Sequence, residues 1–144
     1  MEVYDIQKIQ LASSWDRSAL ESLLQSQGLR LDHDVETAFG VYETSGEEPK
    51  LVGCGCAAGA LLKCFALLPQ LRGQNLLGRL VSALTQDRFA AGYYDLMVIT
   101  RAHNETLFVN SGFWTVAKTK QLVLLENQPD GPARFTAPMV MPGD

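Results

Sequence analysis

The sequence predicts an α+β fold, in which a mixed and mostly antiparallel sheet carries helices on both faces. Short apolar runs of strand length alternate with stretches in which apolar residues have helical spacing. The expected order is strand, helix, three strands, helix, strand, short helix and a final hairpin. The strands flanking the longer helix must be parallel and joined by a right-handed crossover, whereas hairpin partners are antiparallel.

Three strands are expected before the central part of the chain, over residues 2–9, 37–43 and 51–58. The helix between the first two begins at Ser13 or Ser14, with Ser18 as an alternative N-cap. Gly28 is the expected stop signal, and a polar loop follows it. This helix has a narrow apolar stripe, which is typical of a helix packed on the outside of a sheet.

The third strand alternates glycine and cysteine, so one of its faces lacks side chains at Gly53 and Gly55. This pattern predicts close approach of a neighbouring backbone or of a ligand. The chain has 3 cysteines, Cys54, Cys56 and Cys64. Their odd number argues against a disulfide framework, and no fourth ligand for a thiolate metal site is evident. We therefore expect buried structural cysteines and no metal.

The central stretch reads as strand, turn and helix. Residues 61–68 form a nearly continuous apolar run closed by Pro69, which predicts a strand buried on both faces. Helical spacing of leucine and valine begins at Leu76. The turn between them contains Arg72 and Gly73 and no acidic residue. The first amides of a helix lack internal partners, so this geometry suits a phosphate; the alternative is a plain connecting turn.

The C-terminal part is expected to contain a buried strand over 93–100, a short helix over 104–110 and a hairpin. The hairpin strands are expected over residues 113–117 and 121–126. The last 18 residues hold 4 of the 6 prolines. We therefore predict one domain over residues 1–126 and a proline-rich tail or linker over 127–144.

The composition limits the function classes. Hydrophobic residues make up 47% of the 144 residues and charged residues 19%, as in a globular domain with a core. A net charge of −4 argues against non-specific binding of nucleic acid. No apolar run is long enough to span a membrane, and the N-terminus lacks the apolar core of a signal peptide. The expected location is therefore the cytoplasm.

The order of elements and the turn after the central strand resemble the GNAT acetyltransferases over residues 2–126. Pro69, Arg72 and Gly73 match the motif with which that family cradles the pyrophosphate of acetyl-CoA. Asn75 stands where the family has glycine, and Leu77 where it has glycine or alanine. Asparagine is the best substitute for glycine in a left-handed backbone, so the loop shape is expected to survive.

A second match to the GNAT family lies around Asn104 and Phe108. Phe108 stands where the family often has a tyrosine that protonates the departing thiolate, which phenylalanine cannot do. Lys63 is the only charged residue of the central strand, where a general base would stand. Lys63 and His103 are the remaining catalytic candidates. The alternatives are a lysine that reaches solvent from the strand end and a histidine of the surface.

Two runs, over residues 62–69 and 100–113, resemble the N-terminal GNAT-like domain of the citrate lyase ligases. That family uses ATP and acetate to acetylate the prosthetic group of the citrate lyase acyl carrier protein. The resemblance implies this carrier protein and a following nucleotidylyltransferase domain as partners. The alternatives are a stand-alone acetyl-CoA-dependent N-acetyltransferase of unknown amine acceptor, and a fold that binds no ligand.

Acetyl-CoA, CoA and the carrier's prosthetic group share a pantetheine arm. This arm can pair with the backbone of Ala66 and Leu67 as an extra strand would. Both resemblances therefore imply the same cofactor, acetyl-CoA, CoA or a related pantetheine thioester. The expected cofactor-binding residues are Ala66, Leu67, Arg72, Gly73, Gln74, Asn75, Leu76, Leu77, Gly78, Asn104 and Phe108.

Overall fold

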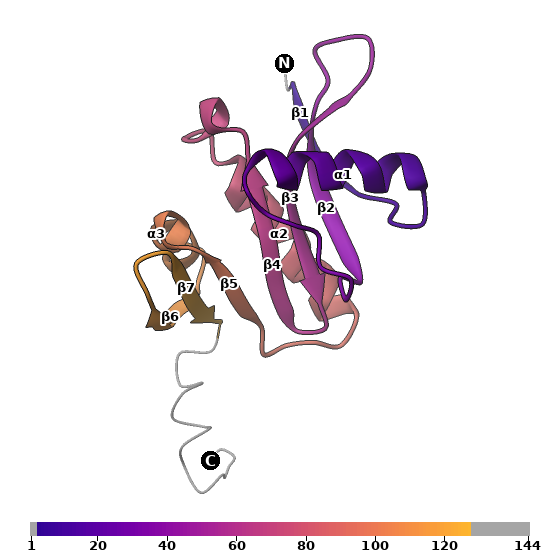
Figure 1. The fold of residues 1–144 in the computed structure, drawn as a ribbon. Coiled ribbons are helices and arrows are strands. Elements are labelled where there is room, and N and C mark those ends of the chain that lie inside the picture. Colours follow the sequence, from indigo (N-terminus) through magenta and orange to yellow (C-terminus); the bar gives the residue numbers. More distant parts are fainter. Residues whose placement is uncertain (1–2, 128–144) are drawn as a thin grey trace, which may run out of the picture.

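The computed structural model describes residues 3–127, which form a seven-stranded sheet with helices on both faces (Figure 1). The strands are β1 (Tyr4–Lys8), β2 (Thr37–Glu43), β3 (Lys50–Ala58), β4 (Leu61–Leu67), β5 (Met97–Arg101), β6 (Trp114–Lys118) and β7 (Leu122–Glu126). The α-helices are α1 (Ser14–Ser26), α2 (Leu76–Ala90) and α3 (Glu105–Asn110), and two short 3-10 helices are η1 (Pro69–Leu71) and η2 (Ala102–Asn104).

The strand order is β1-β2-β3-β4-β5-β7-β6. Strands β4 and β5 are parallel, and every other neighbouring pair in the sheet is antiparallel. The predicted mixed sheet is therefore confirmed, including the parallel pair that the connecting helix required.

The termini of α1 and α2 follow their sequence signals. Ser13 is the N-cap of α1, and its hydroxyl accepts a hydrogen bond from the amide of Asp16 at 3.3 Å. Gly28 follows the helix with φ +74°, a left-handed conformation that glycine adopts without strain. Helix α2 begins at Leu76 as expected, and its N-cap Asn75 is left-handed, with φ +58°.

Each face of the sheet has its own core. Helix α1 lies across β3 and β4, and α2 lies on the opposite face (Figure 1). Buried Cys54 and Cys56 belong to the core under α1, and all three cysteines are free thiols, as predicted. The larger core is under α2 and α3 and includes the fully buried Leu80, Leu84 and Phe108.

The glycines of β3 make room for side chains, so the expected approach of a backbone or ligand is wrong. A Cβ on Gly53 would lie 2.7 Å from Cδ1 of Leu67. A Cβ on Gly55 would lie 2.6 Å from Cε1 of Phe65 and 2.8 Å from Cδ1 of Leu84. Large residues of β4 and α2 therefore pack directly over the backbone of β3.

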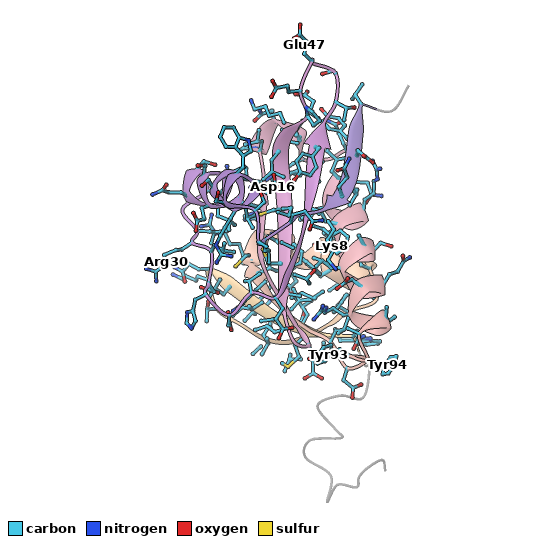
Figure 2. All side chains as sticks on the ribbon, turned by 90° about the vertical axis from the view of Figure 1, so that its right-hand side faces the viewer. Lys8, Asp16, Arg30, Glu47, Tyr93 and Tyr94 are labelled. Carbon is cyan, nitrogen blue, oxygen red and sulfur yellow. The ribbon has the colours of Figure 1, made fainter. Side chains whose placement is uncertain are left out.

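Strand β5 is shorter and less buried than expected. Residues 93–96 precede it, and Figure 2 shows Tyr93 and Tyr94 together at one end of the molecule beyond α2. Ile99 is 37% exposed, because α1 covers β3 and β4 and does not extend over β5. The prediction of a strand buried on both faces over 93–100 is therefore wrong.

The folded part reaches Asn127. Its side chain accepts from the amide of Leu96 at 2.9 Å and donates to the carbonyl oxygen of Tyr94 at 2.9 Å. The rest of the predicted proline-rich tail lies outside the described residues. Within residues 3–127, no helix is long and apolar enough to cross a membrane.

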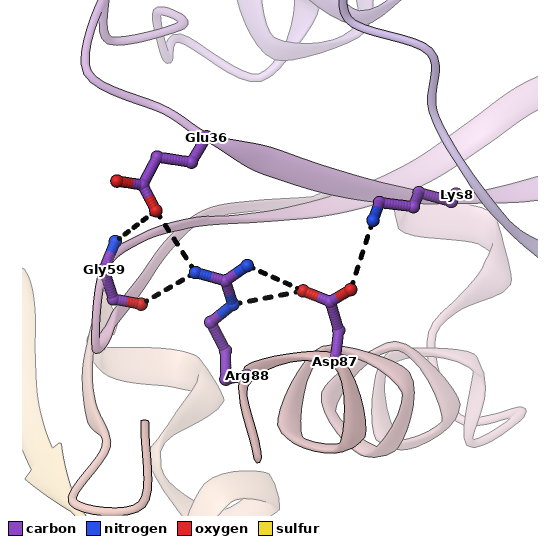
Figure 3. A network of polar contacts seen from close by, with 5 residues as sticks. All are labelled: Lys8, Glu36, Gly59, Asp87 and Arg88. Atoms are coloured by element: carbon purple, nitrogen blue, oxygen red, sulfur yellow. Dashed lines mark hydrogen bonds and ion pairs between the residues drawn. The ribbon is translucent and has the colours of Figure 1, made fainter. Parts of the chain in front are cut away.

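A network of charges joins α2 to the far end of the sheet (Figure 3). The Arg88 guanidinium, whose side chain is 7% exposed, donates to Asp87, to Glu36 and to the carbonyl oxygen of Gly59. Asp87 in turn pairs with Lys8 of β1 at 3.2 Å. The network therefore joins β1, the loop before β2 and the β3–β4 turn to one helix.

Candidate functional site

The sheet opens between its two parallel strands. Strands β4 and β5 pair only at Leu61 with Met97 and at Leu62 with Val98. Within the described chain, the rest of β4 has no partner strand on that side. In sheets with parallel strands, ligands commonly bind beyond the carboxyl ends of the strands, where neighbouring strands separate. Here the opening forms a pocket of about 390 Å³, which we call the main pocket.

The main pocket is lined by β4, the turn after it, the first turn of α2, the end of β5 and the end of α1. The lining residues are Gln27, Leu29, Phe65, Ala66, Leu67, Arg72, Gly73, Asn75, Leu76, Leu77, Arg101, His103, Asn104 and Leu107. As far as the described residues go, this lining contains Arg72 and Arg101 and no acidic residue.

Strand β4 carries a β-bulge beside the pocket. Cys64 and Phe65 together oppose Gly55 of β3, and Cys64 is left-handed with φ +58°. The hydrogen-bonded Cys56 thiol and burial raise the pKa of the Cys64 thiol. Cys64 therefore stays a protonated thiol at neutral pH and is not poised as a nucleophile.

The turn after β4 and the start of α2 form a cradle of backbone amides. Gly73 has φ +91°, and a Cβ there would meet nothing within 4 Å, so the turn faces open space. The first intrahelical bond of α2 runs from the amide of Arg79 to the carbonyl oxygen of Asn75. The amides of Leu76 and Leu77 therefore have no acceptor within the helix, and the helix dipole adds positive charge beside them.

Gly78 affects the cradle through the side chain of Asn75, which packs against it. A Cβ at this position would overlap Oδ1 of Asn75, so the Asn75 side chain folds over the first turn of α2. The absence of a side chain at Gly78 thus makes room for the side chain of Asn75. Gly78 itself does not line the main pocket.

The structure gathers most of the predicted cofactor residues. The eight that line the main pocket are Ala66, Leu67, Arg72, Gly73, Asn75, Leu76, Leu77 and Asn104. Gln74 and Gly78 lie outside the lining. Phe108 is fully buried and packs edge-on against Phe65, with ring centroids 5.0 Å apart, so its role is in the core.

His103 stands at the rim of the main pocket. Burial, followed by the positive charges of Arg72 and Arg101, lowers the pKa of its imidazole. A neutral imidazole at pH 7 has a nitrogen free to accept a proton or a hydrogen bond. His103 therefore remains a catalytic candidate.

Lys63 lies away from the main pocket and is held by two carboxylates. Its ammonium pairs with Asp32 at 3.0 Å and with Asp34 at 2.8 Å, and its side chain is only 12% exposed. The bond to Asp34 raises the pKa of Lys63 and lowers that of Asp34. Lys63 therefore stays charged, and in this arrangement it fastens the loop after α1 to β4.

A residue of β5 orients the side chain of Asn104. Its Nδ2 donates to Oγ1 of the buried Thr100 at 3.0 Å. Since the amide donates there, its Oδ1 is left to accept a hydrogen bond. Among residues 3–127 it has no such donor, and the N–H groups of a bound amide chain would suit it.

Five lining residues were not among the predicted site residues: Gln27, Leu29, Phe65, Arg101 and Leu107. Gln27 and Leu29 reach the pocket because α1 ends over the opening, which no local pattern encodes. Arg101 had a readable signal, because an arginine directly after a parallel strand stands at the edge where ligands bind. Across the described part of the chain, no three His, Cys, Asp or Glu residues are grouped to hold a metal.

Comparison with curated proteins gives citrate lyase ligases. The chain is 32% identical over 126 residues to [citrate [pro-3S]-lyase] ligase of Klebsiella pneumoniae, covering 87% of the chain and 36% of that protein. It is also 32% identical over 97 residues to the enzyme of the same name from Escherichia coli K12, covering 67% and 28%. The chain thus spans about a third of the length of these relatives. No family model matches it.

Comparison with solved structures gives acyl-CoA N-acyltransferases. An acyl-CoA N-acyltransferase from Pseudomonas aeruginosa superposes with a TM-score of 0.65 at 14% identity, covering 87% of this chain and 99% of that one. N-acetylglutamate synthase from Neisseria gonorrhoeae, complexed with coenzyme A and N-acetyl-glutamate, gives a TM-score of 0.59 at 15% identity. That match covers 88% of this chain and 35% of the synthase.

Proposed function

The chain has the GNAT acyltransferase fold and resembles the citrate lyase ligases, and from this we propose that it binds a pantetheine thiol or thioester. The proposed ligand is the arm of CoA, of acetyl-CoA or of a carrier-protein prosthetic group. The proposed setting is the GNAT-like domain of a longer citrate lyase ligase in the cytoplasm. There it would serve acetylation of the citrate lyase acyl carrier protein, next to a nucleotidylyltransferase domain.

The observation that carries the proposal is the charge of the main pocket. Its lining holds Arg72, Arg101 and His103 but no carboxylate, in a chain with a net charge of −4. The Arg72 guanidinium is exposed and makes no hydrogen bond or ion pair within residues 3–127. Together with the free amides of α2, it suits a pyrophosphate or phosphate.

The unpaired part of β4 suits the extended arm. After Leu62 this strand has a free edge toward β5, and Ala66 and Leu67 line the pocket there. Backbone groups of such an edge can pair with the amides of a bound chain as an added strand would. Asn104 lies across the opening and offers its carbonyl oxygen from the other side.

The same site argues against ordinary transfer to an amine. Phe108 is buried in the core, and Lys63 is bound to two carboxylates outside the main pocket. Neither can act as the acid or base at the usual GNAT positions. We therefore expect no turnover of acetyl-CoA with a panel of small amines and peptides, measured by release of free CoA. Saturable turnover with any of these amines would contradict this part of the proposal.

Whether the bound pantetheine arm belongs to free CoA or to a carrier-protein prosthetic group can be tested at the adenosine end of the ligand. CoA carries a 3′-phosphate that dephospho-CoA lacks, and a carrier prosthetic group built on dephospho-CoA would lack it too. If the chain serves such a group, dephospho-CoA should raise the midpoint of thermal unfolding at least as much as CoA. A clearly larger rise with CoA would favour free CoA as the ligand.

A further inference from the structure

A second pocket adjoins the main one on the side where β4 and β5 meet. This side pocket has a volume of about 310 Å³ and lies between the loop after α1, the bulge of β4 and the end of β5. It shares Leu29, Phe65 and Arg101 with the main pocket. A thioester whose arm lies along Ala66 and Leu67 would bring its reacting end to this junction.

Arg101 occupies the junction. Its Nη2 would lie 3.3 Å from a Cβ on Gly28, so the side chain reaches from β5 across the opening to the end of α1. It is half-buried, and within residues 3–127 its guanidinium has no hydrogen bond and no carboxylate partner. A half-buried guanidinium is partly desolvated, and a carboxylate that binds it offsets that cost with charge-assisted hydrogen bonds.

The remaining charges do not compensate Arg101. Among the described residues, Asp32 is the only acidic one that lines the side pocket, and Lys63 already binds it at 3.0 Å. Arg30 also lines the pocket, but its exposed side chain points away from the body of the molecule (Figure 2). The side pocket therefore carries excess positive charge, concentrated at Arg101, and disfavours a cationic amine.

We propose that Arg101 binds a carboxylate of the substrate at the junction of the two pockets. The carboxylate belongs either to the acyl group of the thioester or to a second, free small-molecule substrate. Arginine suits this role because its planar fork donates two parallel hydrogen bonds to one carboxylate. The acyl-group form rests on the pantetheine site of the proposed function, and it needs an acyl group that carries a carboxylate, which acetyl does not.

The test compares ligands that differ only in the carboxylate. Malonyl-CoA and propionyl-CoA are matched in acyl length, and malonate and malonamide are the matched free pair. Calorimetric titration of the chain should show about tenfold tighter binding, or more, for the acid of one pair. The CoA pair identifies an acyl carboxylate, and the free pair, measured with CoA present, identifies a second substrate.

Substitution assigns the preference to Arg101. Arg101→Gln should abolish the preference for the acid, and Arg101→Lys should retain part of it. The matched control is Arg17→Gln on α1, which removes the same charge at a residue that lines neither pocket and should leave the preference intact. The preference is the ratio of the affinities of one variant for the acid and for its neutral partner. A general loss of CoA affinity lowers both affinities and therefore leaves this ratio unchanged.

The outcomes separate the two proposals. If neither acid binds better than its neutral partner, or if Arg101→Gln keeps the preference, the carboxylate proposal is overturned, whatever CoA does. If malonate shows an Arg101-dependent preference but no CoA form binds, the proposed function fails and the carboxylate site stands.

Discussion

At the scale of single residues, the cradle depends on two positive φ angles in one turn. Gly73 faces open space, whereas the side chain of Asn75 lies directly over Gly78. A left-handed backbone costs most L-residues about 1–2 kcal/mol, and asparagine less. The turn therefore keeps a glycine-like shape at Asn75 without a glycine.

Replacing Asn75 tests this account. Asn75→Ala should lower the free energy of unfolding by about 1 kcal/mol, because a left-handed backbone costs alanine more than asparagine. Asn75→Gly is the matched control and should stay within about 0.5 kcal/mol of the wild type. Urea unfolding of the unliganded chain measures both. Equal losses for the two variants would mean that the φ angle of Asn75 is not the determining factor.

Some features of these residues could be predicted from the sequence, and others could not. Asn75 could be predicted because its tolerance of positive φ is a local property. The place of Arg101 at the edge of the sheet also had a sequence signal, but its lack of a carboxylate partner did not, because that depends on where every carboxylate of the fold lies. Likewise, the carboxylate pair around Lys63 comes from a loop some thirty residues earlier in the chain.

At the scale of elements, the loop between α1 and β2 is fastened to β4 by one lysine. Lys63 bonds Asp32 and Asp34, and this loop forms one wall of the side pocket. The position of the wall therefore depends on the ionisation of these carboxylates.

The loop attachment should depend on pH in a defined direction. The Lys63 ammonium lowers the pKa of Asp34, so its stabilisation is fully present above the unfolded value of 3.8 and is lost as pH falls through the depressed folded value. Lys63→Met should therefore destabilise the chain at pH 7 and lose most of that effect near pH 2. Denaturant unfolding at both pH values measures it. A pH-independent difference would show that the ion pairs do not stabilise the loop.

A second element-scale prediction concerns the network of α2 (Figure 3). Arg88→Ala leaves the carbonyl oxygen of Gly59 without its donor and Asp87 with Lys8 alone. We expect a loss of about 3 kcal/mol in the free energy of unfolding, because the Arg88 side chain is 7% exposed. Lys8→Ala removes a pair whose lysine is 53% exposed and should cost under about 1 kcal/mol. Similar losses for both would contradict a buried anchor at Arg88.

At the scale of the whole molecule, the proposed function depends on the separation of β4 from β5 within the sheet. The parallel pairing of β4 and β5 followed from the helix between them, but its restriction to two residue pairs did not. On its other side β5 pairs with β7 along its full length, whereas α3 packs against α2 and β6. Such long-range packing leaves no periodic signal, so the sequence predicted the cradle but not the opening beside it.

The bulge of β4 has a similar explanation. An apolar run specifies a strand, but the extra residue opposite Gly55 depends on register with β3. The bulge and the opening together place Phe65 on the wall of both pockets. The site is therefore a property of the assembled sheet, not of one motif.

The most direct test of the central claim is thermal unfolding with and without CoA, in the wild type and in Arg72→Glu. A ligand at about 100 times its Kd stabilises the folded state by about 2.7 kcal/mol, which for a domain of this size raises Tm by several degrees. We predict this rise for the wild type and a much smaller one for Arg72→Glu, whose unliganded Tm should be nearly unchanged because Arg72 is exposed. No rise in the wild type, or an equal rise in both proteins, would contradict an anion cradle between β4 and α2.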